Sequence, residues 1–189
     1  MQTIKKLSDE LGPEQLLVLE YHTKDTWSSK ETEALYKYYG SEGTPSVYFD
    51  GANGVSGGGD TEYLYARYKR IIAKEAAVAP PIALGAAKLR ENIPGAVNVK
   101  IENVSGSVLE GAWLYAVAYQ DLDTERHHFM VSAISKKALP SVSTGEAFET
   151  ELYFDTQASL LNTVVFVKSG SGQVLQAALI PGTTQLWLP

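Results

Sequence analysis

The three histidines are the side chains of this sequence best suited to acid–base chemistry or metal binding. His127 and His128 are adjacent in a segment that we expect to be a strand, so their rings point to opposite faces and cannot share one ion. His22 follows Glu20 on the same face of another predicted strand, and Asp25 is close in sequence. This pattern suits acid–base catalysis, but the sequence offers no matching nucleophile. We therefore interpret His22 as a hydrogen-bonded structural residue, and we expect no catalytic residue, no metal site and no cofactor.

Cysteine chemistry is excluded, because the chain contains no cysteine. Disulfides, thiolate catalysis and cysteine-ligated zinc therefore cannot form within the chain. Ser28 and Glu31 have the S-x-x-E spacing of a capping box, which starts a helix and gives Ser28 a structural role.

A glycine cluster at residues 54–59 precedes a predicted helix that begins after Asp60. Such a loop can bind phosphate through its backbone amides. Here it lacks the Lys-Ser/Thr pair of a P-loop, and Asp60 would repel an anion, so we interpret the cluster as a tight turn. The net charge of −6, from 16 basic and 22 acidic residues, argues against nucleic-acid binding, because that needs a basic face.

No segment of the sequence has the composition of a membrane span. The longest apolar stretch, residues 76–87, is about a dozen residues long and contains two prolines, whereas a spanning helix needs about 20 residues. Residues 1–9 lack the apolar core of a signal peptide and have the pattern of a helix interior. We therefore expect no membrane span and no signal peptide in this chain.

Pro80-Pro81 separates two parts of the sequence that differ in pattern. In the first part, helix and strand patterns alternate. The expected order is a helix ending at Gly12-Pro13, a strand at 16–22, a helix from Ser28 to Gly40, a strand within 43–51, an Asn53-Gly54 hairpin with a short strand around Val55, and a helix from Asp60.

The second part contains only strand patterns. They lie near residues 82–90, 96–104, 111–120, 127–135, 146–154, 163–168 and 173–180. Alternation is clearest where Val97, Val99 and Ile101 alternate with polar residues. Seven strands in about 100 residues without a helix are typical of an antiparallel β-sandwich of immunoglobulin-like type. We therefore expect two domains, residues 1–79 and residues 82–189.

The first part resembles the second half of a thioredoxin fold. The resemblance rests on residues 16–25, on residues 38–40 and on residues 43–51, where Thr44-Pro45 matches a cis-proline position. The strings at 20–25 and 174–178 are similar to those of bacterial extracytoplasmic thioredoxin-like proteins, often labelled outer-membrane-protein-like, that carry an immunoglobulin-like sandwich after this domain. The resemblance implies an incomplete thioredoxin-like α/β domain followed by an antiparallel immunoglobulin-like β-sandwich. It also implies that Thr44 and Pro45 form the substrate loop, and that the protein is periplasmic or on the cell surface.

The chain departs from this family at its beginning. The first strand and the Cys-x-x-Cys helix start of the family would precede residue 1, and residues 2–11 look like the end of that helix. The resemblance then favours a redox-inactive scaffold that acts as a protein-interaction module for an unknown protein partner. The alternative is a fragment of a thiol-disulfide oxidoreductase whose CxxC lies upstream of Met1. The missing central strand would expose sheet edges, so we expect a homo-oligomer or a disturbed first domain.

Overall fold

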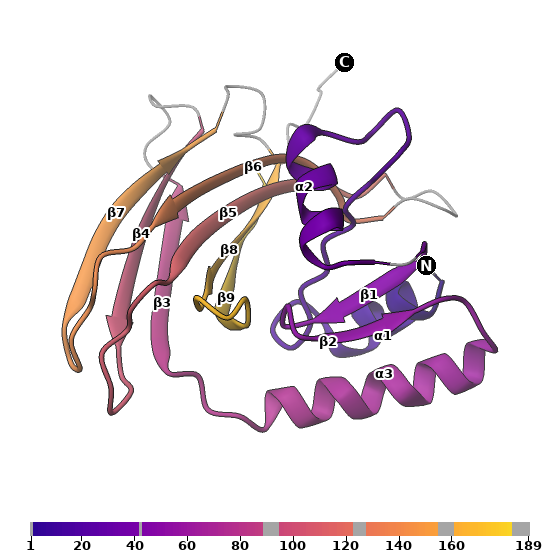
Figure 1. The fold of residues 1–189 in the computed structure, drawn as a ribbon, viewed down its shortest axis with the longest axis horizontal. Coiled ribbons are helices and arrows are strands. Elements are labelled where there is room, and N and C mark those ends of the chain that lie inside the picture. Colours follow the sequence, from indigo (N-terminus) through magenta and orange to yellow (C-terminus); the bar gives the residue numbers. More distant parts are fainter. Residues whose placement is uncertain (1, 42, 89–94, 123–127, 155–160, 183–189) are drawn as a thin grey trace, which may run out of the picture. The chain divides into compact units, whose positions relative to one another are not determined.

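The structure is a computed structural model that describes residues 2–41, 43–88, 95–122, 128–154 and 161–182. The chain divides into two compact units. Unit 1 comprises Met1–Ala79 and Asp121–Val131, and unit 2 comprises Pro80–Gln120 and Ser132–Pro189 (Figure 1). The expected domain division at residues 79 and 82 stays a prediction, since a compact unit is not thereby shown to fold alone. In the described ranges no helix is long and apolar enough to cross a membrane.

The described residues of unit 1 form three helices and the smallest sheet. The helices are α1 (Gln2–Leu11), α2 (Lys30–Tyr38) and α3 (Thr61–Ala76), and the sheet pairs β1 (Ser46–Phe49) with β2 (Asn53–Ser56). As predicted, Asp60 caps α3, because its side chain accepts a hydrogen bond from Tyr63 N. Apolar residues of α1 and α3 recur at helical spacing and bury one face of each helix. The shared core consists of Ile4, Leu7, Phe49, Val55, Tyr68 and Ile72.

The cap of α2 differs from the prediction by one residue. Ser29, not Ser28, is the N-cap: its side chain accepts from Thr32 N, and the Thr32 hydroxyl accepts from Ser29 N. These two bonds form a capping box in which threonine replaces the predicted Glu31. Ser28 Oγ instead donates to Asp25 O at 2.7 Å, so it stabilises the loop before the helix.

The β1–β2 hairpin turns at Asp50 and Gly51 rather than at the predicted Asn53-Gly54. Asp50 and Gly51 have positive φ values, 47° and 72°, as a type I′ turn requires. A 3.0 Å backbone hydrogen bond closes the turn. Asn53 and Gly54 instead begin β2. Asp-Gly and Asn-Gly favour the same turn, so the sequence holds two hairpin signals, of which the structure uses the first.

Residues 16–22 do not form the predicted strand. In the described part of the chain, Glu20 alone forms a β-bridge there, with Met130. A strand needs a neighbour that accepts and donates along its length, and the sheet of unit 1 holds β1 and β2 alone among the described residues. The expectation of a thioredoxin-like α/β domain is therefore wrong. Among its described residues, unit 1 has a two-stranded antiparallel sheet and three helices.

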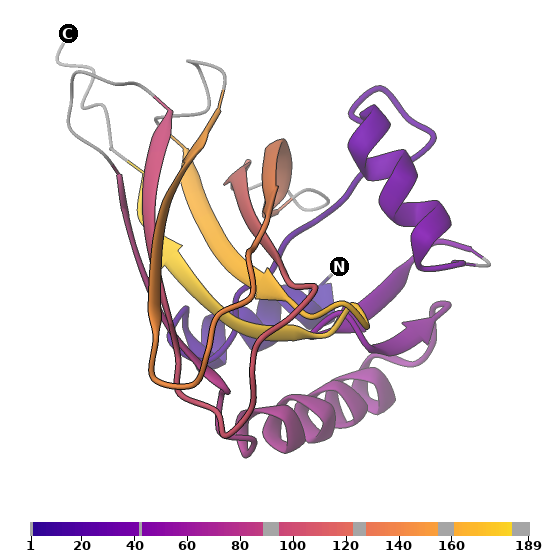
Figure 2. The same cartoon turned by 60° about the vertical axis from the view of Figure 1, so that its left-hand side comes forward.

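Among the described residues, the other elements are seven strands in two antiparallel sheets (Figures 1 and 2). They are β3 (Ile82–Lys88), β4 (Ala96–Asn103), β5 (Trp113–Gln120), β6 (Met130–Ala138), β7 (Ala147–Tyr153), β8 (Asn162–Lys168) and β9 (Val174–Ile180). One sheet has the order β3-β4-β7 and the other β6-β5-β8-β9. Each predicted strand is present, and β6 begins within the chain assigned to unit 1.

The alternation predicted for β4 is confirmed. Val97, Val99 and Ile101 are buried, whereas Lys100 and Glu102 are exposed. The buried residues join side chains from both sheets in one core. That core includes Ile82, Leu114, Ala116, Leu152, Val165 and Val167. Burial of these side chains is the main stabilising contribution of unit 2.

The immunoglobulin-like assignment was wrong. In an immunoglobulin constant-type sandwich, the fourth strand lies in the sheet of the first, second and fifth strands. Here the fourth strand of unit 2, β6, lies beside β5 in the other sheet. The chain has no cysteine for the disulfide between the sheets, and Trp113 on β5 is exposed instead of buried. The second unit is therefore assigned only as an antiparallel β-sandwich.

Candidate functional site

Thr44 and Pro45, the predicted substrate-loop residues, lie in the turn that enters β1. The peptide bond between them is cis. Both residues are exposed. Pro45 O accepts a hydrogen bond from Gly57 N at 2.9 Å, which joins this turn to the end of β2. The structure therefore places an exposed turn directly before β1, and a substrate role for the two residues stays a prediction.

One edge of β1 is paired with β2, and the other is open among the described residues. Hydrogen-bonded and non-hydrogen-bonded residue pairs alternate along an antiparallel ladder. Because Pro45 and Gly57 are hydrogen-bonded, Val47 is also bonded to β2. The backbone N–H and C=O groups of Ser46 and Tyr48 consequently point away from β2. We call these outward groups of Ser46 and Tyr48 the β1 edge.

The Tyr48 side chain beside the β1 edge is held by three contacts. Its ring stacks on Tyr39 with centroids 4.2 Å apart. Its hydroxyl lies 2.8 Å from Ser41 Oγ and donates to Tyr39 O at 3.2 Å. Across the hairpin, Gly54 leaves room for the ring, because a Cβ there would come within 2.8 Å of Tyr48 Cε1. Burial raises the pKa of Tyr39, so its hydroxyl stays protonated at neutral pH. The aromatic pair is therefore fixed in place.

A histidine–carboxylate cluster lies elsewhere in unit 1. His22 is buried, with 8% of its surface exposed. Its Nδ1 lies 2.7 Å from Asp25 Oδ2, and its Nε2 lies 3.4 Å from Glu20 Oε1. The hydrogen bond from His22 lowers the pKa of Asp25 below its ordinary value, so that carboxylate stays ionised at mild acidity. The predicted role of His22 as a hydrogen-bonded residue is confirmed.

Glu20 connects this cluster to residues far away in sequence. Its carboxylate accepts a hydrogen bond from His128 N at 3.1 Å. Its backbone N–H donates to Phe129 O at 2.9 Å, and its backbone oxygen accepts from Val131 N at 3.0 Å. Side chain and backbone of one residue thus hold residues 128–131 against residues 20–22.

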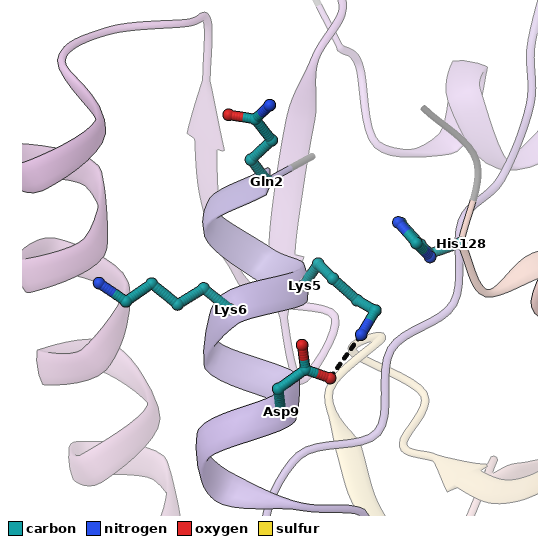
Figure 3. A pocket seen from close by; sticks show the side chains of 5 residues that line it. All are labelled: Gln2, Lys5, Lys6, Asp9 and His128. Carbon is teal, nitrogen blue, oxygen red and sulfur yellow. Dashed lines mark hydrogen bonds and ion pairs between the residues drawn. The ribbon is translucent and has the colours of Figure 1, made fainter. Parts of the chain in front are cut away.

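His128 also lines an open pocket of about 460 Å³ beside α1 (Figure 3). The lining residues are Gln2, Lys5, Lys6, Asp9 and His128. Lys5 donates to Asp9 at 2.5 Å, and Lys6 points away from His128 (Figure 3). The ring of His128 is oriented by Asp121, whose Oδ1 lies 2.9 Å from Nδ1. Because the Lys5 charge is paired with Asp9, the pocket offers no concentrated positive charge for an anion.

The structure describes only part of the predicted His127–His128 pair, because His127 lies outside the described residues. His128 precedes β6 and is not in a strand. Within the described ranges, no group of three or more metal-ligating side chains could hold an ion. Sequence reasoning missed the contact between Glu20 and His128, which are 108 residues apart. It also missed the open β1 edge.

Comparisons with known proteins concern the fold alone. No protein-family model and no curated protein matches the chain. HBP35 of Porphyromonas gingivalis has a similar structure, with a TM-score of 0.69 over 100% of this chain and 71% of that one, at 15% identity. A red sea bream transglutaminase has a TM-score of 0.35 over 63% of this chain and 19% of its own, at 16% identity, which is too low to carry an argument. The predicted membership in a thioredoxin-like family is therefore corrected: no family model supports it, and the chain shares its fold with HBP35.

Proposed function

We propose that the chain is a protein-interaction module that binds an extended segment of its partner along the β1 edge. The observation that carries the proposal is the outward row of backbone groups at Ser46 and Tyr48. An extended segment can add to such a row through the same hydrogen bonds that join strands within a sheet. The exposed turn at Thr44 and Pro45 leaves the start of the row accessible.

The side chains beside the β1 edge favour it over the outer edge of β2. Strand addition draws affinity from the backbone and specificity from neighbouring side chains. Tyr48 presents a ring fixed against Tyr39 and a hydroxyl paired with Ser41. On β2, by contrast, Gly54 and Ser56 are small and exposed. A partner segment therefore gains specific contacts along β1 that β2 does not offer.

The oxidoreductase alternative is not proposed, because it rested on the thioredoxin resemblance that the comparisons contradict. The chain itself contains no cysteine and so no thiolate for disulfide exchange. A protein-interaction role, by contrast, requires no thiolate.

Two proline substitutions give a matched test. Ser46 and Ser56 lie opposite each other in the hairpin register, and in both the backbone N–H points away from the partner strand. Ser46→Pro removes an outward donor from β1, and Ser56→Pro removes the equivalent donor from β2. Both substitutions break the contact between the two hydroxyls, which are 3.1 Å apart. Ser46→Pro also removes the 2.7 Å hydrogen bond from Ser46 Oγ to Gly43 O, so the variants differ in the edge that they block and in this one turn contact.

The probe is a set of extended dodecapeptides selected by phage display on the purified chain. Their affinities for the wild type and for both variants are measured by fluorescence anisotropy. Ser46→Pro loses one backbone hydrogen bond to the peptide, and the proline ring clashes with the added strand. Binding to this variant should therefore be weaker by about tenfold or more. Binding to Ser56→Pro should stay within about twofold of the wild type. Equal binding to Ser46→Pro and the wild type contradicts the proposal, as does a selection that yields no peptide.

A further inference from the structure

We propose that two copies of this chain associate through oppositely charged faces. A row of cations on α3 of one copy binds a row of carboxylates on β4 and β7 of the other copy. The proposal goes beyond the proposed function and does not rest on it, because the β1 edge takes no part in this contact.

The cations on α3 lie in one row along the helix. Tyr63, Arg67, Arg70 and Lys74 stand at positions i, i+4, i+7 and i+11, which share one side of an α-helix. All four side chains are exposed, and Tyr63 is 61% exposed. Another side of α3 packs into the core of unit 1. We call these four residues the α3 stripe, which presents three cations and one aromatic ring to solvent.

The three cations of the α3 stripe have no acidic neighbours on the helix. Arg67 and Arg70 are three residues apart, and Arg70 and Lys74 are four apart, which are the spacings at which like charges on a helix repel. No acidic residue stands three or four positions from any of them. The ion pair between Lys69 and Glu10 involves a different side of α3. An acidic partner surface would therefore offset a repulsion that the helix itself leaves in place.

The β3-β4-β7 sheet carries mainly the opposite charge on its solvent side. Glu102 and Lys100 of β4 are exposed there, and the register places Glu149, Glu151 and Tyr153 of β7 on the same side. Lys100 lies 3.8 Å from Glu149, but both side chains are more than half exposed, so this pair is weak. The hydroxyl of Tyr153, which is 56% exposed, donates to Glu151. We call these five residues the β4–β7 face, in which three carboxylates accompany one ammonium group.

Small residues beside both surfaces permit a close approach of helix and sheet. On β3, Ala83, Gly85 and Ala87 are exposed and pair with the solvent-facing residues of β4. None of them has a side chain larger than a methyl group. On α3, the exposed Ala66 and Ala73 lie beside the stripe. A helix can therefore lie over β3 while its longer side chains reach the carboxylates of β4 and β7.

The charges on the two surfaces are also spaced alike. At 1.5 Å per helical residue, the α3 stripe extends about 16 Å from Tyr63 to Lys74. Glu102 is level with Ala147, six residues before Tyr153, so the β4–β7 face extends about 20 Å. Each row begins at a tyrosine and continues through its charged groups. The difference of about 4 Å is within the reach of long, flexible arginine and lysine side chains.

The ionic strength decides which electrostatic effect dominates. Each copy has a net charge of −6, so two copies repel each other over long distances. At 0.15 M salt the Debye length is about 8 Å, which screens this repulsion but leaves charge pairs at contact distance effective. Exposed charge pairs are individually weak, so we expect a weak association that needs concentrations up to about 0.5 mM to be measured.

Sedimentation velocity at 0.15 M salt, over a series of protein concentrations, tests the proposal with two charge-reversed chains. Arg67→Glu/Arg70→Glu makes both surfaces acidic, and Glu149→Lys/Glu151→Lys makes both basic. Each variant alone should associate at least about tenfold more weakly than the wild type. An equimolar mixture should associate within about threefold of the wild type, because each surface then meets one of opposite charge. Both variants keep a net negative charge, so overall attraction does not explain such a recovery.

Two further variants separate this contact from other causes. Lys30→Glu/Lys37→Glu on α2 changes the net charge as much as the α3 variant does, at exposed positions outside both surfaces, and should associate like the wild type. Ser46→Pro should do the same, because it alters only the β1 edge and its turn. A wild type that stays monomeric up to about 0.5 mM overturns the proposal. So does a mixture that fails to recover, an α2 variant as weak as the α3 variant, or a loss of association in Ser46→Pro.

Discussion

Asn103, the last residue of β4, has no exposed surface and makes four side-chain hydrogen bonds. Its Nδ2 donates to Ser107 O and to Val142 O, both at 2.8 Å. Its Oδ1 accepts from Ser105 N at 3.0 Å and from Ser105 Oγ at 2.7 Å. The amide therefore closes the turn after β4 and connects it to residue 142. Asn103 and Ser105 have glycosylation-site spacing, but this amide is occupied within the fold.

Removal of this amide should be costly. In Asn103→Ala, Val142 O loses one of its two donors and keeps the bond from Leu109 N, and the bonds to Ser105 and Ser107 are lost as well. Each lost hydrogen bond costs about 0.5–1.5 kcal/mol, and least where Ser107 is exposed to water. We therefore expect a loss of about 2–4 kcal/mol. Asn103→Asp should lose more at neutral pH, since a carboxylate oxygen then faces two carbonyl oxygens. Acidification should partly restore that variant, because burial raises the pKa of the new carboxyl and a protonated carboxyl can donate.

Urea unfolding of the full chain, followed by circular dichroism, measures these losses, and hydrogen exchange in β4 and β8 assigns them to unit 2. Asn98→Ala is the matched control, because Asn98 is half-buried on the same strand and its side chain makes no hydrogen bond among the described residues. The control should lose less than about 1 kcal/mol. The reasoning is refuted if Asn103→Ala costs no more than Asn98→Ala, or if Asn103→Asp is as stable as the wild type at pH 7.

Three further predictions concern unit 1. Ser29→Ala should cost about 1 kcal/mol in thermal unfolding because it removes the α2 cap, whereas Ser28→Ala should cost less than about 0.5 kcal/mol. Reduced hydration, together with the Glu75 carboxylate, raises the pKa of Asp50, so its ionisation opposes folding as the pH rises. Asp50→Asn should therefore stabilise the chain at pH 7 by up to about 0.5 kcal/mol, with the gain vanishing in acid; a loss at pH 7 would contradict this. If the chain self-associates through the β1 edge, sedimentation equilibrium should show Ser46→Pro to be monomeric, and an unchanged association would exclude that edge.

The strands of unit 2 were predictable because local pattern decides them. In β4 the alternation of Val97, Val99 and Ile101 with polar residues fixes both the strand and its buried face. Which strands become neighbours in a sheet is not decided by local pattern. The position of β6 beside β5, which separates this sandwich from an immunoglobulin constant-type arrangement, has no signal in the residues of β6 themselves.

The errors in unit 1 have two physical causes. Residues 16–22 have the composition of a buried strand, but a strand forms only where a neighbour supplies hydrogen bonds, and Glu20 finds one bridge, to Met130. At residues 28–29, two adjacent serines can each cap a helix, and hydrogen bonds to Asp25 and Thr32 decide between them. The β1 edge was harder to predict, because whether one edge of a strand is open depends on which other segments join its sheet.

Amide exchange along β1 in the isolated chain is the most direct test of the central claim. The claim is that Ser46 and Tyr48 present their backbone groups outward while Val47 is bonded to β2. We predict that the amide of Val47 is protected and that those of Ser46 and Tyr48 exchange at least about tenfold faster, becoming protected when a selected peptide binds. Equal protection of all three amides in the free monomer would contradict it, because the β1 edge would then already be paired.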